Sequence, residues 1–113
     1  MYSISSQKIS ISSSEYVYSD TIKLNPGVYI ARCCPTFSNI SSSGLLQVLI
    51  ANKDDSSVYM RNTQYVEKNQ IWYGEVCTVF KISSDINLCI KIHQSTNSAI
   101  DCTTSSLIVV KIR

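Results

Sequence analysis

The sequence VCTVFKISSDINLCIKIH, residues 76–93, contains the clearest pattern in this chain of 113 residues. Apolar side chains occupy alternate positions on both sides of a central Ser83-Ser84-Asp85 segment. A period of two, interrupted by turn-forming residues, predicts two β-strands that each bury one face. The side chains expected inward are Val76, Thr78, Phe80 and Ile82 before the turn and Ile86, Leu88, Ile90 and Ile92 after it. Those expected outward are Glu75, Cys77, Val79, Lys81, Asn87, Cys89, Lys91 and His93.

Similar short segments fill most of the chain. The strand-favouring residues Ile, Val and Thr, together with the aromatic residues, make up 41 of the 113 residues, and no segment has a helical period. Turn-forming residues separate about eight such segments, which predicts an all-β antiparallel sandwich or barrel with no substantial helix. We expect one domain at residues 15–113, with a core that includes Ile30, Val48, Ile50, Phe80, Leu88, Ile90 and Val109.

Residues 1–14 differ from the rest because they are rich in serine and carry few apolar side chains. Such a segment buries too little apolar surface to offset the entropy of ordering alone. We therefore expect an N-terminal arm that adds as a strand to a neighbouring chain or a capsid protein. Its apolar anchors would be Ile4, Ile9 and Ile11.

Charge and hydropathy argue against two classes of partner. Ten basic and eight acidic residues leave a net charge of +2, and the basic residues never form a run. A nucleic-acid-binding surface is therefore not expected. The apolar runs at residues 44–50 and 107–110 are far shorter than the ~18 residues of a membrane span. The first eight residues also lack the pattern of a secretory signal, so we expect synthesis and residence in a cytoplasm before assembly.

No pattern in the sequence predicts catalysis or metal binding, and we expect no enzyme activity, no cofactor and no metal. His93 could be combined with Asp101 and Cys89, but no nucleophile lies in a strand–turn–helix motif. Asp54-Asp55 lacks a third carboxylate nearby for calcium. The cysteines are odd in number and match no zinc spacing, which predicts buried or half-buried thiols in a reducing compartment. They are Cys33, Cys34, Cys77, Cys89 and Cys102.

Four aromatic residues are the candidates for contact with a ligand or a partner. Tyr59, Tyr65, Trp72 and Tyr73 cluster in the middle third of the chain, among amide side chains. Aromatic rings with amides can stack on and hydrogen-bond a sugar, and the same side chains are enriched at protein interfaces. We favour a subunit or partner interface over a glycan site.

Three stretches resemble the compact jelly-roll of the tumour-necrosis-factor and complement-type superfamily, whose domains also occur in bacteriophage head fibres, decoration proteins and receptor-binding tips. The turn and strand at residues 24–31 are similar to its inner strand, residues 79–88 to its internal turn segment, and residues 107–112 to its closing strand. The resemblance covers residues 15–113. It implies a jelly-roll sandwich that assembles as a homotrimer, with no catalytic residue to carry over.

Together these observations favour a non-enzymatic bacteriophage protein on the virion surface. A capsid decoration protein or a head-fibre knob, trimeric and attached to the capsid or a fibre by its arm, is the leading hypothesis. Contact with a host-surface glycan is compatible with it. The alternatives are a carbohydrate- or receptor-binding module at the tip of a tail fibre, and a small secreted lectin-like domain.

Overall fold

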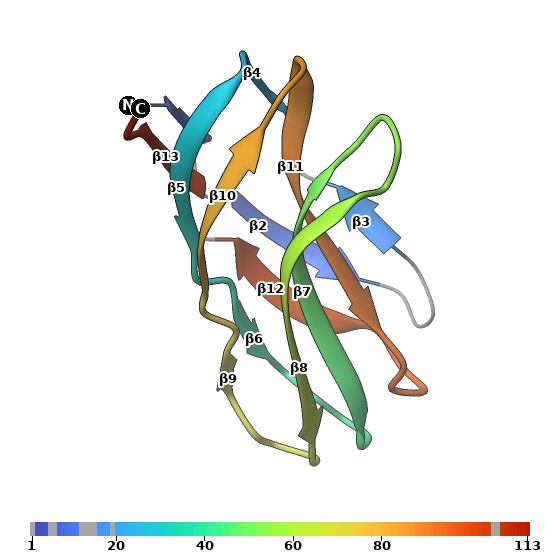
Figure 1. Ribbon diagram of the computed structural model, residues 1–113. Helices are drawn as coiled ribbons and strands as arrows, with labels where there is room; N and C mark the ends of the chain where they lie inside the picture. The colour runs from blue at the N-terminus through green and yellow to red at the C-terminus, as the bar shows by residue number, and fades with distance from the viewer. Residues whose placement is uncertain (1, 5–6, 12–15, 19, 105–106) are drawn as a thin grey trace.

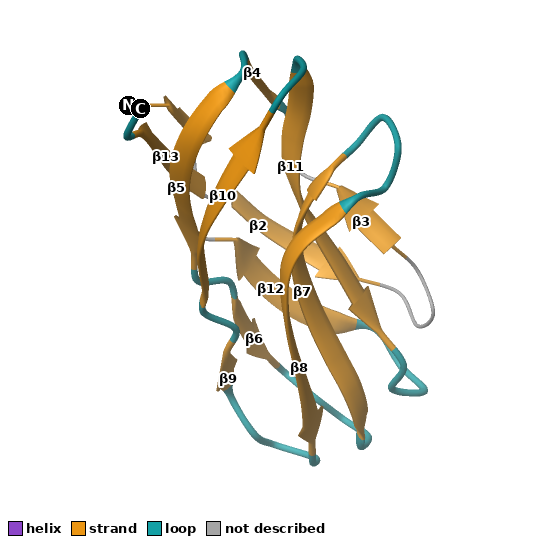
Figure 2. Cartoon of the chain, in the orientation of Figure 1, coloured by secondary structure: helices purple, strands orange, loops and turns teal. Residues whose placement is uncertain are grey.

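The computed structural model describes residues 2–4, 7–11, 16–18, 20–104 and 107–113. Within these residues the chain forms thirteen strands and no helix, and hence no helix able to cross a membrane (Figure 2). The strands are β1 (Tyr2–Ile4), β2 (Gln7–Ile11), β3 (Tyr16–Tyr18), β4 (Ile22–Leu24), β5 (Gly27–Cys33), β6 (Thr36–Ser38), β7 (Gly44–Asn52), β8 (Val58–Val66), β9 (Trp72–Tyr73), β10 (Val76–Ile82), β11 (Ile86–Gln94), β12 (Ile100–Thr104) and β13 (Leu107–Lys111). The predicted all-β class is confirmed.

These strands form two layers (Figure 1). In one layer β11 lies between β7 and the pair β3 and β4, and β8 is the outer neighbour of β7. The other layer has two blocks, β1-β13-β5-β10 and β2-β12-β6-β9. Cys33 pairs with Val76 in the first block, and Thr36 pairs with Tyr73 in the second. From one pair to the next, each of the two chain segments continues by three residues, so their register is the same in both blocks. Because this register is preserved, we call the two blocks together the long sheet.

The chain alternates between the layers. β4 pairs with β11, whereas β5, directly after the Asn25-Pro26 turn, pairs with β10 and β13. β10 and β11 also lie in different layers, although the short turn at 83–85 joins them. β7 and β8 instead form a hairpin within one sheet. Four long strand positions in each layer, joined in this order, make an antiparallel jelly-roll sandwich. The predicted fold class is confirmed.

A close approach of the chain marks the break between the two blocks. The amide of Gly74 donates a hydrogen bond to the carbonyl oxygen of Pro35, with an N–O distance of 2.8 Å. A Cβ atom at Gly74 would lie 2.8 Å from the Cγ2 atom of Val48, which is too close for a side chain. Glycine is therefore required where the β9–β10 strand turns past the core.

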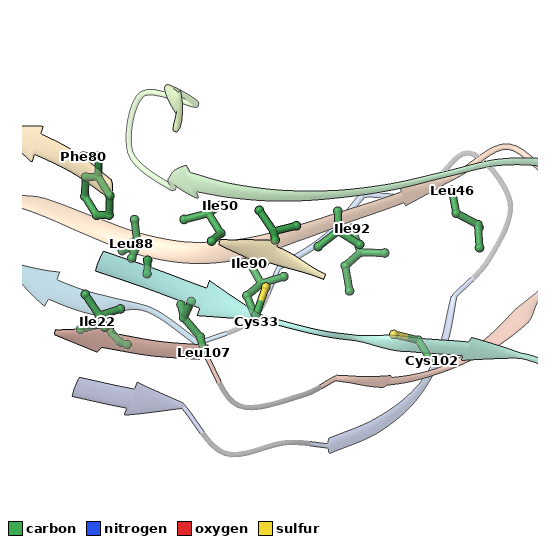
Figure 3. Close-up of a cluster of buried hydrophobic side chains, with 14 of the residues drawn as sticks. Ile22, Cys33, Leu46, Ile50, Phe80, Leu88, Ile90, Ile92, Cys102 and Leu107 are labelled. Carbon is green, nitrogen blue, oxygen red and sulfur yellow. The ribbon is translucent and has the colours of Figure 1, made fainter. Parts of the chain in front are cut away.

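The core lies between the layers and contains six of the seven predicted residues. Val48, Ile50, Phe80, Leu88, Ile90 and Val109 are all buried, and Figure 3 shows several of these side chains together.

The prediction for Ile30 is wrong, because β5 turns Tyr29, Ala31 and Cys33 inward and leaves Ile30 exposed. The Tyr29 hydroxyl donates a hydrogen bond to the Asn25 carbonyl oxygen at 2.6 Å, which holds the ring on the inner side.

The thiols only partly follow expectation. Cys33 and Cys102 are buried in the core and Cys34 is half-buried, as predicted. Cys77 is exposed, because it lies on the outer face of β10, the edge strand of its block. Cys89 is fully buried, as predicted for the thiols, although its position in the alternation is outward; it pairs with Ala51. A small side chain on a central strand can be covered by longer neighbours.

The described residues of the N-terminal segment, 2–4 and 7–11, pair with strands of the same chain. β1 pairs with β13 and β2 with β12. Ile11 is fully buried in the core, and the buried Gln94 donates a hydrogen bond from Nε2 to the Ile11 carbonyl oxygen at 3.0 Å. The prediction of Ile11 as a docking anchor is therefore wrong. The backbones of Ile4 and Ile9 pair with Leu107 and Cys102. Their side chains lie outside the described part of the structure.

Candidate interaction surface

Two of the four aromatic candidates pack against the core. Tyr59 is half-buried and stacks on Phe80, with ring centroids 4.6 Å apart. Trp72 stacks on the buried Phe37 at 5.4 Å. Burial also raises the pKa of Tyr59 above its ordinary value. Both rings therefore stabilise the core, and only part of each is accessible to a partner.

The other two candidates are exposed but lie in different layers. Tyr65 on β8 is 54% exposed and Tyr73 on β9 is 64% exposed. β8 belongs to the sheet with β7 and β11, whereas β9 belongs to the long sheet. Tyr65 pairs across the hairpin with Leu45, which is also exposed. The four aromatic residues are therefore not brought together as one stacking platform.

A different surface brings four exposed aliphatic side chains together. Ile30 lies directly between Val79 on one neighbouring strand and Val110 on the other. Ile108 is in the next outward position along β13, opposite Arg32. Their exposed fractions are 38% for Ile30, 62% for Val79, 43% for Val110 and 38% for Ile108. We call these four residues the apolar face.

Positive charge accompanies the apolar face. Arg32 follows Ile30 on the outer side of β5, and Lys81 follows Val79 on β10. Both are exposed, and Cys77 lies opposite Arg32 in the register. Among the described outward side chains of β5, β10 and β13 there is no carboxylate, and Glu75 lies just before β10 begins. The surface therefore combines aliphatic side chains with two cations.

Beside the exposed Leu45 and Tyr65, the outer side of the other sheet carries polar side chains. One row across it contains Thr63, Gln47 and His93, and the adjacent row contains Arg61 and Lys91 on either side of the buried Leu49. The Gln47 amide donates a hydrogen bond from Nε2 to the Thr63 hydroxyl at 3.1 Å. We call Gln47, Arg61, Thr63, Lys91 and His93 the polar face.

The groups considered for catalysis are held apart. His93 lies on β11, whereas Asp101 lies on β12 in the other layer and accepts a hydrogen bond from the Asn39 amide. Cys89 is buried, and burial raises the pKa of its thiol. The arrangement therefore gives these three groups no shared site.

The carboxylates considered for calcium bind the chain itself. The Asn87 amide donates a hydrogen bond to Asp54 at 2.7 Å, and the backbone amide of Ser57 donates one to Asp55 at 2.9 Å. This second bond lowers the pKa of Asp55. Within the described residues no group of three potential metal ligands occurs. These carboxylates order the β7–β8 hairpin loop.

The sequence contained two signals for the apolar face. Residues 107–110 are all apolar, so both faces of this strand carry apolar side chains, as in strands that are covered on both sides. Val79 is apolar although it falls on the outward face, between Cys77 and Lys81. Neither signal shows by itself that Ile30 joins them, since that depends on the inward orientation of Tyr29.

No protein-family model and no curated protein matches the chain. Among solved structures it is similar to a chain of infectious bursal disease virus, Gx strain, with a TM-score of 0.58 and 12% sequence identity. The match covers 99% of this chain and 31% of that one. The VP2 subviral particle of infectious bursal disease virus gives a TM-score of 0.57 with 12% identity, covering 96% and 32%. A family 16 carbohydrate-binding module covers 90% and 74% at a TM-score of 0.42 and 16% identity.

These similarities concern the fold. The chain spans about a third of the length of the viral chains it matches. At such low identity no residue role is transferred from them. The jelly-roll sandwich found here is the fold that the chain shares with these viral particle proteins.

Proposed function

We propose that the chain is a non-enzymatic structural protein of a virion surface, a capsid decoration protein or head-fibre knob of a bacteriophage that assembles as a trimer. The observation that carries this proposal is the contrast between the apolar face and the polar face. A sandwich in free solution has no need for aliphatic side chains on one outer side, whereas an assembled subunit buries that side. The jelly-roll resemblance to trimeric phage domains and the viral structural neighbours support the same proposal.

In this proposal the two faces have separate roles. The apolar face contacts a neighbouring subunit, and the polar face, with its hydroxyl, amide and cationic groups, contacts solvent or the host. Synthesis takes place in the host cytoplasm, and the mature location is the particle surface.

Attachment to a capsid or fibre protein would use the N-terminal segment in a different way from a mobile arm. β1 and β2 form one edge of the long sheet. A strand from the particle could add to this edge through main-chain hydrogen bonds, the mode known as strand augmentation.

The direct test is the location of the protein. Virus particles whose genome encodes the chain would be purified as a band on a density gradient and washed to remove loosely bound protein. They would then be digested for peptide mass spectrometry. We expect peptides of this chain to band with the major capsid protein at a fixed stoichiometry. Recovery of the chain only in the soluble fraction would contradict the proposal.

A carbohydrate- or receptor-binding role is the second candidate, and the exposure of Tyr65 and Tyr73 favours it. Binding to a glycan array that is lost in Tyr65→Ala or Tyr73→Ala would support this role. Trp72→Ala is a poorer probe, because Trp72 packs on the core and its loss can unfold the domain. Retained binding in both tyrosine variants would remove these residues as the glycan site.

A further inference from the structure

We infer that the apolar face is covered by a second copy of this chain, and that the two copies pack head to tail rather than face to face. This inference rests on the proposed function, because it names the surface through which the subunits assemble. Head-to-tail contacts join two different surfaces, so they can close into a ring of three. Face-to-face contacts instead join the same surface twice and produce a dimer.

The first support is the pattern of β13. Its inward side chains, Leu107 and Val109, are fully buried in the core. Its outward side chains, Ile108 and Val110, are equally aliphatic but exposed. A strand with aliphatic side chains on both sides is typical of sheets that are covered on both faces. The chain alone covers one face of β13, so the other requires a neighbour.

The distribution of charge indicates which surface that neighbour presents. Arg32 lies on β5, inside the sheet and between β13 and β10. If two copies stacked face to face about β5, Arg32 would lie over the outward residues Val28, Ile30 or Arg32 of the other copy, none of which is acidic. A cation buried without a counter-charge is strongly unfavourable. A different surface of the second copy, with carboxylates, satisfies Arg32 and Lys81.

The chain has carboxylates of this kind away from the apolar face. Asp54 and Asp55 are exposed in the β7–β8 hairpin loop, and Val58 and Met60, at the start of β8, are exposed as well. Carboxylates next to exposed aliphatic side chains have the chemistry that the apolar face needs. This hairpin is in the layer opposite the long sheet, so its contact with the apolar face of another copy joins two different surfaces, as in head-to-tail packing.

The size of the face also disfavours a simple dimer. The apolar face spans three strands about 4.8 Å apart, the longest of seven residues at about 3.4 Å each, which gives a projected area of roughly 340 Å². A stable complex usually buries about 800 Å² on each partner. One face-to-face contact would fall short of this area. In a ring each subunit uses two surfaces, which roughly doubles its buried area.

Cys77 supplies a built-in reporter for this surface. It is exposed and pairs with Arg32, whereas Cys33, Cys89 and Cys102 are buried. In a Cys34→Ser background, N-ethylmaleimide followed by mass spectrometry would measure the modification of Cys77 from about 1 μM to about 1 mM protein. We expect its rate to fall about tenfold as roughly nine tenths of the chains assemble. Light scattering on the same samples should give three times the chain mass of 12.6 kDa.

Matched variants separate the apolar face from the rest of the molecule. Val79→Glu changes the most exposed of the four aliphatic side chains and should give a folded monomer with Cys77 reactive at every concentration. Arg32→Glu should weaken assembly at least tenfold through the loss of the charge pairing. Thr63→Glu, on the polar face, is the control and should assemble like the wild type. Circular dichroism and thermal unfolding would verify that each variant is folded.

Three results would overturn the inference. The first is a monomer with constant Cys77 reactivity across the whole concentration range. The second is a dimer with Cys77 protected, since a closed pair indicates face-to-face packing. The third is a trimer that Val79→Glu leaves intact. A trimer that protects Cys77 but is absent from particles would instead refute the proposed location on a virion and leave this inference standing.

Discussion

Val79 and Phe80 are adjacent on β10 and lie on opposite sides of the long sheet. Phe80 is enclosed between Tyr29 and Tyr59, with ring centroids 5.8 and 4.6 Å away, whereas Val79 projects outward beside Ile30. Both side chains are apolar, yet the chain itself covers only one of them. On the other sheet the outward positions carry Thr63, Gln47 and His93 instead. Selection for a stable core accounts for Phe80, whereas the proposed assembly would account for Val79.

The largest expected effect concerns the edge beside the apolar face. Deletion of residues 2–11 removes β1, β2 and the buried Ile11, and exposes the edges of β12 and β13. We expect the loss of most of the ~5–15 kcal/mol that stabilises a domain of this size. Thermal and urea unfolding would measure it. A truncated chain as stable as the full chain would mean that β1 and β2 do not contribute to stability. The long sheet would then have β13 as its edge beside the apolar face.

The next effect compares the two neighbours on β10. Phe80→Ala should reduce the free energy of unfolding by about 3–5 kcal/mol, because it leaves a cavity between two rings. Val79→Ala should change it by less than about 0.5 kcal/mol, because the side chain is exposed in the isolated subunit. Urea unfolding below the concentration of assembly provides both values. Equal costs for the two variants would show that Val79 is covered within its own chain.

A third effect comes from the buried polar network next to β2. Gln94 is fully buried and donates hydrogen bonds to the carbonyl oxygens of Ile11 and Ser98, while its Oε1 atom accepts one from the Thr96 amide. Gln94→Leu removes these three hydrogen bonds from a buried site and should cost about 2–3 kcal/mol. Ser95→Ala, at the exposed residue next to Gln94, is a mild control. If Gln94→Leu proved neutral, the network would not hold β2 in place.

Alkaline pH should destabilise the domain through its buried thiols. Burial raises the pKa of Cys33 and Cys102 from 9.0 to about 12. The unfolded chain then ionises first, so stability is complete below about pH 9 and declines between pH 9 and 12. The slope is about 1.4 kcal/mol per pH unit for each thiol. Unfolding curves across this range, with Cys33→Ala as the comparison, would measure it. A slope unchanged in that variant would contradict the burial of Cys33.

The smallest effect is expected on the polar face. Gln47→Ala removes an exposed hydrogen bond to Thr63 and should cost about 0.5 kcal/mol or less. Assembly, measured by light scattering, should be unchanged. If Gln47→Ala weakened assembly more than Val79→Glu does, the polar face rather than the apolar face would be the assembly surface.

The sequence by itself determined the parts of the fold that depend on local pattern. The alternation at residues 76–93 placed Phe80, Leu88 and Ile90 in the core, because the strand period of two fixes which side chains share a face. The turn at residues 83–85 and the β7–β8 hairpin followed from residues that favour turns. The likeness to known jelly-rolls supplied the layered arrangement, which local patterns alone leave open between a sandwich and a barrel.

Tertiary structure alone decided the features that depend on pairing between distant segments. Ile11 is in the core because β2 pairs with β12, some ninety positions along the chain, and a serine-rich segment gives no local indication of that partner. Tyr29 rather than Ile30 points inward because the ring meets Phe80 across β5 and β10. The apolar face depends on the same registers, since Val79, Ile30 and Val110 come from three separate strands. Local periodicity gives each strand its two faces, whereas the long-range pairing of strands determines which face meets the core.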